Sequence, residues 1–339
     1  MTEQNALLPT PVEPDSSELI HAGQAANYHA AQNAFTDYLS RKATNTIRRQ
    51  RADLDRFREY LLAAGLSPHD LQHDPDAWRG LTWGIVEGFV KWMVAQGDAM
   101  GSINVRLSTV KTYAKLAAKA GAIEAQELAL IRTVAGYSQK ESRRMDGRRE
   151  VTRRGEKKAQ AVHIEQEQAQ RLKAQPDTPQ GRRDRLLMCL LIDHGLRVGE
   201  VAALEVTSFD LQAGEMRFYR AKVDQTQTHK LSADTLRAVQ AWIASGDAPT
   251  TGKLLRASRK GGTLTGTGMS ERGITKRVKE LGEQIGLEGL SAHDCRHYWA
   301  TFWATKVDVL RLQEAGGWSS LAMPRRYVEA AKIANEGMA

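Results

Sequence analysis

Two short segments in the second half of the chain carry residue types that could bind and transfer a phosphate group. Arg197 stands at the predicted start of a helix with Glu200 one turn later, so the carboxylate can hold the guanidinium in a fixed pose. His293 and Arg296 are three residues apart and share one face of another predicted helix. A histidine that exchanges protons near neutral pH, beside a permanently charged phosphate binder, suits phosphoryl transfer. By itself, the Arg197 pair would be an ordinary surface contact.

The second of these helices also raises the alternative of a metal site. His293 and His297 are four residues apart, which is the spacing of a zinc-binding histidine pair on one helix face. Arg296 would place a positive charge beside the metal, and the sequence shows no third ligand. We therefore expect no metal ion at this helix.

A tryptophan that follows two glycines, Trp318, is itself followed nine residues later by Tyr327. In the order arginine, hairpin lysine, His-x-x-Arg, tryptophan and tyrosine, these motifs resemble those of the tyrosine site-specific recombinase family, also called the phage integrase family. The resemblance covers nearly all of the second half of the chain, and the helical first half is similar to the core-binding domain of the family. Within the family, the chain looks most like the simple Cre-like type.

The resemblance implies a role for each matching residue. Tyr327 corresponds to the nucleophile, which attacks a DNA phosphate to form a 3′-phosphotyrosyl link and a free 5′-hydroxyl. Arg197 and Arg296 correspond to the pair that binds the non-bridging oxygens and stabilises the charge of the transition state. Glu200 corresponds to the acidic residue that supports the first arginine.

Two further matches concern proton transfer. His293 corresponds to a residue that assists proton transfer and holds the phosphate. Trp318 stands where many family members have histidine, and its indole can donate one N–H but cannot titrate. Because the phosphotyrosyl link retains the bond energy, the resemblance implies a reaction without ATP, a metal ion or another cofactor.

The lysine that the family uses to protonate the departing 5′-oxygen lies on a β-hairpin. Lys222, just after the strand predicted at 215–220, matches this position best, and Lys230 is the alternative. A lysine must lose some proton affinity to act as an acid near neutral pH, and neighbouring arginines would lower its pKa.

Helical periodicity dominates the segments that must position these residues. In the first half it predicts helices over 26–39, 44–64, 83–96, 102–120 and 124–134. In the second half it predicts helices over 182–193, 197–204, 233–244, 270–285, 292–304, 306–314 and 325–335. Alternation of apolar and polar residues predicts a strand over 215–220 that returns within 221–232. The expected fold is mainly α with one small antiparallel β-sheet, and the resemblance implies a C-shaped clamp around DNA.

Composition shifts divide the chain into four parts. Residues 1–25 are rich in proline and acidic residues and are predicted to form a flexible tail. Residues 26–138 are helical in pattern, and the resemblance implies that they form a SAM-like core-binding domain that binds DNA. Residues 139–160 are predicted to be a basic linker, since 140–158 contain nine basic and four acidic residues and no apolar stripe. Residues 161–339 are predicted to form the catalytic domain.

The overall charge favours a polyanionic partner. The formal net charge is +8 and the isoelectric point is near 9.4. No apolar run is long enough to cross a membrane. Two cysteines are too few for a disulfide framework in a chain of this length. Residues 1–40 lack the basic start of a secretory signal. We expect a cytoplasmic, nucleoid-associated protein without a membrane partner. The basic residues expected to contact DNA are Arg48, Arg49, Arg51, Lys111, Lys115, Arg143, Arg144, Arg148 and Arg149.

The resemblance implies a site-specific DNA recombinase that exchanges strands through a Holliday junction. Its partner would be double-stranded DNA with inverted-repeat core sites, bound by a homotetramer that is a monomer or dimer when free. One alternative is a type IB topoisomerase, against which Trp318 and the core-binding half argue. Another is a catalytically silent DNA-binding accessory protein, against which the intact set of matching residues argues. The target sequence and the biological direction of the reaction, whether integration, excision, resolution or inversion, are not encoded in these motifs.

Overall fold

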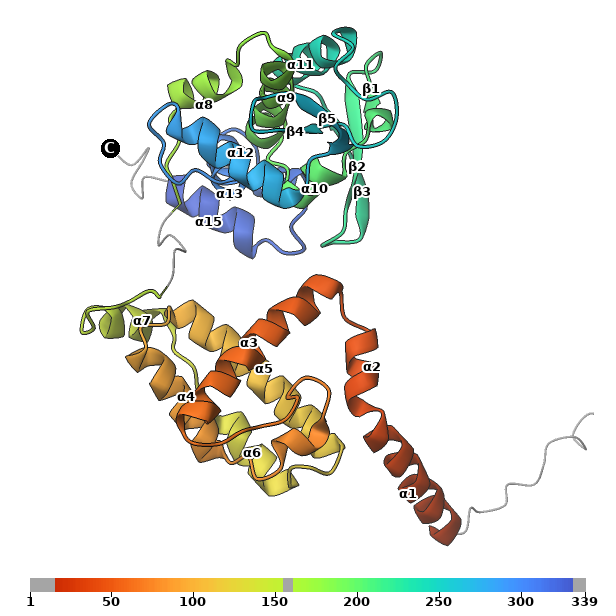
Figure 1. The fold of residues 1–339 in the computed structure, drawn as a ribbon, viewed down its shortest axis with the longest axis vertical. Helices are drawn as coiled ribbons and strands as arrows, with labels where there is room; N and C mark the ends of the chain where they lie inside the picture. The colour runs from red at the N-terminus through yellow and green to blue at the C-terminus, as the bar shows by residue number, and fades with distance from the viewer. Residues whose placement is uncertain (1–15, 155–160, 332–339) are drawn as a thin grey trace, which may run out of the picture. The chain divides into compact units, whose positions relative to one another are not determined.

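The computed structural model describes residues 16–154 and 161–331. The chain divides into two compact units, Met1–Lys157 and Lys158–Ala339, each with its own hydrophobic core (Figure 1). Both units are built mainly from helices, and the small sheets of the second unit are antiparallel. This confirms the predicted mainly α fold. Among the described residues, no helix combines the length and the apolar character needed to cross a membrane.

The first unit is a bundle in which helix α5 contacts most of the other elements. Buried aromatic residues fill its centre, among them Phe57, Trp78, Phe89 and Tyr113. Thr82 caps the start of α4 by accepting a hydrogen bond from the Ile85 amide, as its sequence position predicts. The helices of this unit are α1 (Ser16–Gln32), α2 (Ala34–Ser40), α3 (Thr44–Ala63), η1 (Pro75–Trp78), α4 (Trp83–Ala95), α5 (Met100–Lys119), α6 (Ala125–Thr133) and α7 (Gln139–Asp146).

The predicted flexible tail is wrong over residues 16–25, because α1 already begins at Ser16. All three prolines of the segment precede Asp15, and the residues after it are rich in alanine, which has the highest helix propensity. Glu18 also lies in the first turn, where a negative charge favours the helix dipole. The part of the tail prediction that concerns residues 1–15 lies outside the described residues.

The predicted linker is also wrong over most of its length. Residues 139–146 form helix α7, which Ser138 and Glu141 start with a reciprocal capping box. The Arg149 guanidinium then donates to the carbonyls of Val94, at 3.3 Å, and Asp98, at 2.9 Å. These contacts attach the segment to the first unit, and residues 155–160 of the predicted linker lie outside the described residues.

The second unit is organised around helix α9 (Pro179–Asp193), most of whose side chains are buried. Gly195 ends this helical stretch with φ +59°, and a Cβ there would lie 2.4 Å from the Trp299 ring. The glycine that the sequence places at this helix end is therefore required by both backbone and packing. The other helices are α8 (Gln166–Lys173), α10 (Val198–Ala203), η2 (Val206–Ser208), α11 (Ala233–Ala244), α12 (Glu271–Glu283), α13 (Ala292–Ala304), α14 (Val309–Gly316) and α15 (Ala322–Ala331).

The second unit has two small antiparallel sheets where the sequence predicted one. The predicted hairpin is confirmed: β2 (Glu215–Arg220) pairs with β3 (Gln225–Lys230), and β1 (Phe209–Asp210) adds an edge. The second sheet consists of β4 (Arg256–Ser258) and β5 (Leu264–Gly268). Both strands are short and none of their residues is fully buried, and β5 consists mostly of glycine and threonine, so the strands carry no alternating hydrophobic pattern.

Candidate active site

Helix α13 presents the His-x-x-Arg motif. Ser291 and Asp294 form the capping box that their spacing predicts, and an Asp294 oxygen also accepts from the Val162 amide at 3.1 Å. This fixes the first turn of the helix, on which His293 is exposed and Arg296 is 4% exposed. The Arg296 guanidinium lies 4.7 Å from the centre of the Trp318 ring, a cation–π distance.

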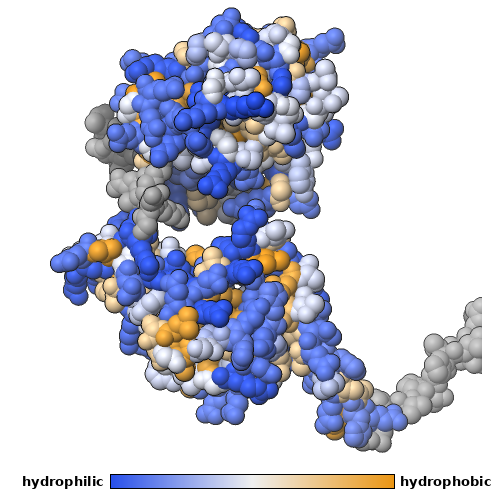
Figure 2. Space-filling view, viewed as in Figure 1, coloured by the Kyte–Doolittle hydropathy of each residue, from blue (hydrophilic) through white to orange (hydrophobic). Residues whose placement is uncertain are grey.

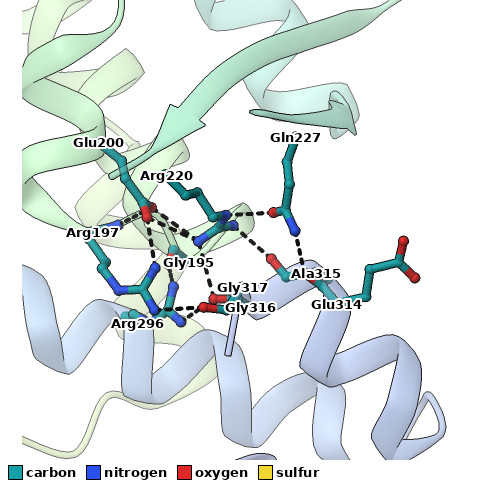
Figure 3. A network of polar contacts seen from close by, with 10 residues as sticks. All are labelled: Gly195, Arg197, Glu200, Arg220, Gln227, Arg296, Glu314, Ala315, Gly316 and Gly317. Atoms are coloured by element: carbon teal, nitrogen blue, oxygen red, sulfur yellow. Dashed lines mark hydrogen bonds and ion pairs between the residues drawn. The ribbon is translucent and has the colours of Figure 1, made fainter. Parts of the chain in front are cut away.

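The Arg296 guanidinium is held by backbone carbonyls. It donates to Gly195 at 2.6 Å and to Gly316 at 2.5 Å (Figure 3). Burial, followed by the positive charges of Arg197 and Arg220, lowers the pKa of Arg296 to about 9. The guanidinium is still charged at neutral pH, and an anion that enters the site would stabilise this positive charge.

Arg197 and Glu200 form the pair that their spacing predicts. The Arg197 guanidinium donates to Glu200 at 2.7 Å, and the other Glu200 oxygen accepts from the Arg197 amide at 2.8 Å. A second guanidinium nitrogen of Arg197 donates to the Gly317 carbonyl at 3.0 Å. The Arg197 side chain retains 24% exposure, so it is fixed in direction and still open to a ligand.

Sequence reasoning missed a third arginine, Arg220 at the end of β2, whose side chain is fully buried. Its guanidinium donates to both Glu200 oxygens, at 3.1 and 3.2 Å, and to the carbonyls of Ala315 and Gly316 (Figure 3). It also donates to Gln227, which itself donates to the Glu314 carbonyl. The signal was present in the sequence, because the alternation of β2 places Arg220 on the same buried face as Met216 and Phe218.

The Gly-Gly-Trp run begins at Gly316, the last residue of α14, and its glycine carbonyls contact these arginines. Gly317 has φ +57°, and a Cβ there would lie 2.5 Å from Cδ of Arg220. A Cβ on Gly316 would lie 2.0 Å from the Trp318 ring. The two glycines therefore allow their carbonyls to approach the guanidinium groups closely enough to accept hydrogen bonds from all three arginines.

Tyr327 lies on α15 with only 7% exposure and packs in a small core with Trp299 and Trp318. Its ring centre is 5.9 Å from that of Trp318. Its hydroxyl lies 3.0 Å from Nδ1 of His297. Burial raises the pKa of the Tyr327 phenol, and the positive charge of Arg296 opposes this rise.

His297 is a second residue to which the sequence assigned no role in the reaction. Its Nε2 lies 3.1 Å from Nε2 of His293, so the two histidines considered as a zinc pair contact each other. In residues 16–154 and 161–331, no group of three or more metal-ligating side chains is found. The four-residue spacing of His293 and His297 was the signal available in the sequence, where it was considered only as a metal-binding pattern.

The two candidate lysines lie at opposite ends of strand β3. Lys222 is exposed in the turn between β2 and β3, two residues after Arg220. Lys230 is at the far end of β3 with its side chain 80% exposed, 3.7 Å from Glu215. Both lysines therefore lie on the predicted hairpin, and strand β2 before the turn with Lys222 is attached to the arginine cluster through Arg220. The choice of Lys222 as the general acid stays a prediction.

The basic residues expected to contact DNA fall into two groups. Three are used inside the first unit: Lys111 donates to the Arg132 and Val134 carbonyls, Arg49 pairs with Asp53, and Arg149 pairs with Asp146. The others are exposed, and Figure 2 shows that hydrophilic side chains cover much of the surface of both units. These others are Arg48, Arg51, Lys115, Arg143, Arg144 and Arg148, and the Arg49 side chain is also 46% exposed despite its ion pair.

A mainly α unit that brings a buried tyrosine beside a cluster of arginines fits a class of phosphate-processing DNA enzymes. Residues 163–333, half of the chain, match the phage integrase family, and the chain therefore belongs to that family. This confirms the family predicted from the motifs.

Individual relatives agree with this assignment. Tyrosine recombinase XerC of Vibrio parahaemolyticus is 29% identical over 161 residues, which cover 47% of this chain and 50% of the relative. XerC of Vibrio cholerae is 26% identical over 290 residues, which cover 83% of this chain and 81% of the relative. The alignment thus spans about half the length of the first of these relatives. A lambda integrase tetramer bound to a Holliday junction has a similar fold, with a TM-score of 0.59, 14% identity and coverage of 90% of this chain and 80% of that one.

Proposed function

We propose that this protein is a site-specific DNA recombinase that cleaves and rejoins DNA through a 3′-phosphotyrosyl intermediate. The observation that carries the proposal is the placement of Tyr327 against Trp318, which itself stacks on Arg296. A potential nucleophile thus lies at the edge of a cluster of guanidinium groups. The family and its relatives named as tyrosine recombinases support the same activity.

The charge balance of the site indicates its substrate. Arg197 and Arg220 pair with one carboxylate, Glu200, and Arg296 is held by carbonyls beside them, which leaves two positive charges uncompensated among the groups of this network. A phosphodiester would neutralise one of them and could bind to donors that are already fixed in direction. Arg197 is the most open of the three, so it binds a non-bridging oxygen directly, and Arg296 stabilises the charge that grows in the transition state.

The resemblance to the family supports the remaining roles in this proposal. Tyr327 attacks phosphorus, the bond to the 5′-oxygen breaks, and Lys222 on the hairpin turn supplies the proton for that oxygen. His293 contacts the phosphate from the exposed first turn of α13. Trp318 holds Arg296 and Tyr327 in place by packing and takes no part in acid–base chemistry, because an indole does not titrate. Glu200 orients Arg197. The step needs no ATP, metal ion or other cofactor.

The partner in this proposal is double-stranded DNA with inverted-repeat core sites. The first unit supplies sequence-independent phosphate contacts through its exposed basic residues, and the second supplies the chemistry. By analogy with the lambda integrase tetramer on a Holliday junction, four copies assemble on two sites and exchange strands through that junction. The free protein is a monomer or dimer, acts in the cytoplasm and is associated with the nucleoid.

Covalent trapping tests the proposal. Nicked suicide substrates that carry candidate sites are incubated with wild type, with Tyr327→Phe and with Tyr298→Phe, a tyrosine on α13 outside the proposed site. Wild type and Tyr298→Phe are expected to give a slow band on a denaturing gel that Tyr327→Phe lacks. A site that is bound but never gives an adduct would favour the silent DNA-binding alternative, and adducts with relaxation but no junction products would favour a topoisomerase.

A further inference from the structure

The nucleophile proposed above has a direct hydrogen-bond partner to which neither the motifs nor the proposed function gives a role. The Tyr327 hydroxyl lies 3.0 Å from Nδ1 of His297, which is one turn after His293 on α13. The two rings are 5.4 Å apart, centre to centre. A contact of this length between a phenol and an imidazole nitrogen is within the range required for proton transfer.

The contact continues to a second imidazole. Nε2 of His297 lies 3.1 Å from Nε2 of His293. If the Tyr327 hydroxyl donates to His297, Nδ1 of His297 is the unprotonated nitrogen and its proton is on Nε2. That proton is directed at Nε2 of His293, which then carries its own proton on Nδ1. A single tautomer at each ring therefore satisfies both contacts and leaves a lone pair of His297 facing the phenol.

The nucleophile needs such a partner. Tyr327 is 7% exposed, and burial raises its pKa above the ordinary value near 10, so the phenol is protonated at neutral pH. Trp318, its other close aromatic neighbour, offers no titrating nitrogen, and the guanidinium of Arg296 is a donor only. His297 lies within hydrogen-bond reach of the Tyr327 hydroxyl, and imidazole accepts protons near neutral pH.

We infer that His297 is a catalytic residue that removes the proton of Tyr327 during cleavage and returns it during rejoining; the inference rests on the proposed recombinase function. As the phenolic O–H bond breaks, its proton moves to Nδ1 of His297, and the phenolic oxygen forms a bond to phosphorus. The bond between phosphorus and the 5′-oxygen breaks, and this oxygen takes a proton from the Lys222 ammonium to leave as a hydroxyl. In rejoining, the 5′-hydroxyl returns its proton to Lys222, and the His297 imidazolium protonates the departing phenolate.

His293 acts one step further from the nucleophile. When Nδ1 of His297 accepts the phenolic proton, the imidazolium carries protons on both nitrogens, and Nε2 of His293 accepts a hydrogen bond from it. His293 therefore stabilises the charged form of His297, in addition to its proposed contact with the phosphate.

The test uses the full-length protein with a tyrosine analogue in position 327. Trifluorotyrosine has a phenol that loses its proton near neutral pH because the ring fluorines withdraw electrons, so it needs no base. His297→Asn is combined with either tyrosine or trifluorotyrosine at residue 327, and adduct formation is timed in single turnover on a suicide substrate. His163→Asn, an exposed histidine before α8, is the matched control.

With ordinary tyrosine, His297→Asn is expected to slow cleavage by about 10²- to 10⁴-fold, the usual contribution of a general base, while His163→Asn cleaves like wild type. With trifluorotyrosine, the His297→Asn protein is expected to recover most of this rate, whereas the protein with His297 intact gains nothing. This recovery separates a proton acceptor from a residue that only supports the packing of Tyr327, because the analogue restores an ionised phenol but does not restore packing.

Two results would overturn the inference while leaving the proposed function intact: cleavage by His297→Asn at the wild-type rate, or a slowing that trifluorotyrosine does not reverse in a protein that still binds the site. His297→Gln, measured in the same way, replaces the asparagine variant if thermal unfolding shows that the latter is not folded. If wild type forms no adduct at a bound site, the proposed function itself fails, and the role of His297 fails with it.

Discussion

Arg220 is the residue on which the largest number of side-chain hydrogen bonds in the site converge. It is fully buried and shares Glu200 with Arg197, so its removal would leave a buried carboxylate with one cation and would take one donor from each of the Ala315 and Gly316 carbonyls. Arg220→Met is expected to lower the free energy of unfolding by about 3 kcal/mol or more, the usual cost of breaking a buried ion pair. Urea unfolding measures this effect.

The matched control for this prediction is Arg217→Met, which removes an exposed arginine from the same strand. It is expected to change the free energy of unfolding by less than about 0.5 kcal/mol. Equal effects of the two substitutions would show that the buried network does not hold the hairpin to the arginine cluster.

Two histidines, the buried His194 and the partly buried His229, make stability depend on pH. Burial, and then the positive charge of Lys173, lowers the pKa of His194 to about 4. Burial, and then neighbouring His194 and Arg220, lowers the pKa of His229 to about 3. Both groups are neutral in the folded protein and take up protons on unfolding below their ordinary pKa of 6.5. The contribution of these two histidines to the free energy of unfolding is therefore fully present above pH 6.5 and is lost as the pH falls toward 4.

Urea unfolding at pH 7.5 and pH 4.5 checks this dependence. The double variant His194→Gln, His229→Gln is expected to lose less unfolding free energy between the two pH values than wild type, even if it is less stable at both. An identical decrease in the two proteins would mean that other groups control the acid sensitivity.

At the scale of elements, the Gly-Gly-Trp segment after α14 is the most tightly constrained connection in the site. Gly317→Ala adds a Cβ at 2.5 Å from Arg220 on a backbone with φ +57°. Gly214→Ala has a similar φ of +65° but meets no atom within 4 Å. We expect Gly214→Ala to cost about 1 kcal/mol of backbone strain, and Gly317→Ala to cost more and to slow cleavage.

Thermal unfolding of both variants measures the cost of backbone strain, which the two share. Single-turnover cleavage measures the effect of displacing the arginines, which is expected only for Gly317→Ala. Normal cleavage by Gly317→Ala at equal stability to Gly214→Ala would contradict the role given to this turn.

The elements also show how far sequence reasoning reaches. Helices α3, α11 and α13 lie within one residue of their predicted limits because each has a clear apolar stripe and a defined start. Two of the partners of Arg220 could not be predicted, because they are the backbone carbonyls of Ala315 and Gly316, about a hundred residues away in sequence. His297 was visible as a spacing, but only the position of α15 shows that its partner is Tyr327. Helix α7 was not predicted, because its charged and polar sequence has no apolar stripe and therefore no periodic signal.

At the scale of the whole molecule, exposed and engaged basic residues should affect DNA binding differently. Replacing Arg143, Arg144 and Arg148 together with glutamine is expected to weaken DNA binding at all sequences. The slope of log affinity against log salt concentration should become shallower by about 0.9 for each phosphate that is no longer neutralised. Fluorescence anisotropy titrations across a range of salt concentrations measure both quantities.

Arg149→Gln is the contrasting variant, because the Arg149 side chain is only 12% exposed and binds Asp146 and backbone carbonyls of the same unit. It is expected to lower the stability of the first unit and to leave the salt dependence unchanged. A full salt-slope effect from Arg149→Gln, with none from the triple variant, would reverse the assignment of these residues.

The central claim is that the Tyr327 phenol becomes joined to the 3′ end of cleaved DNA. The most direct measurement is to trap the adduct on a suicide substrate, digest the protein and the DNA, and locate the nucleotide on its peptide by mass spectrometry. The account predicts a nucleotide attached through its 3′-phosphate to Tyr327, with the released strand bearing a 5′-hydroxyl. Attachment to another residue, or through a 5′-phosphate, would contradict it.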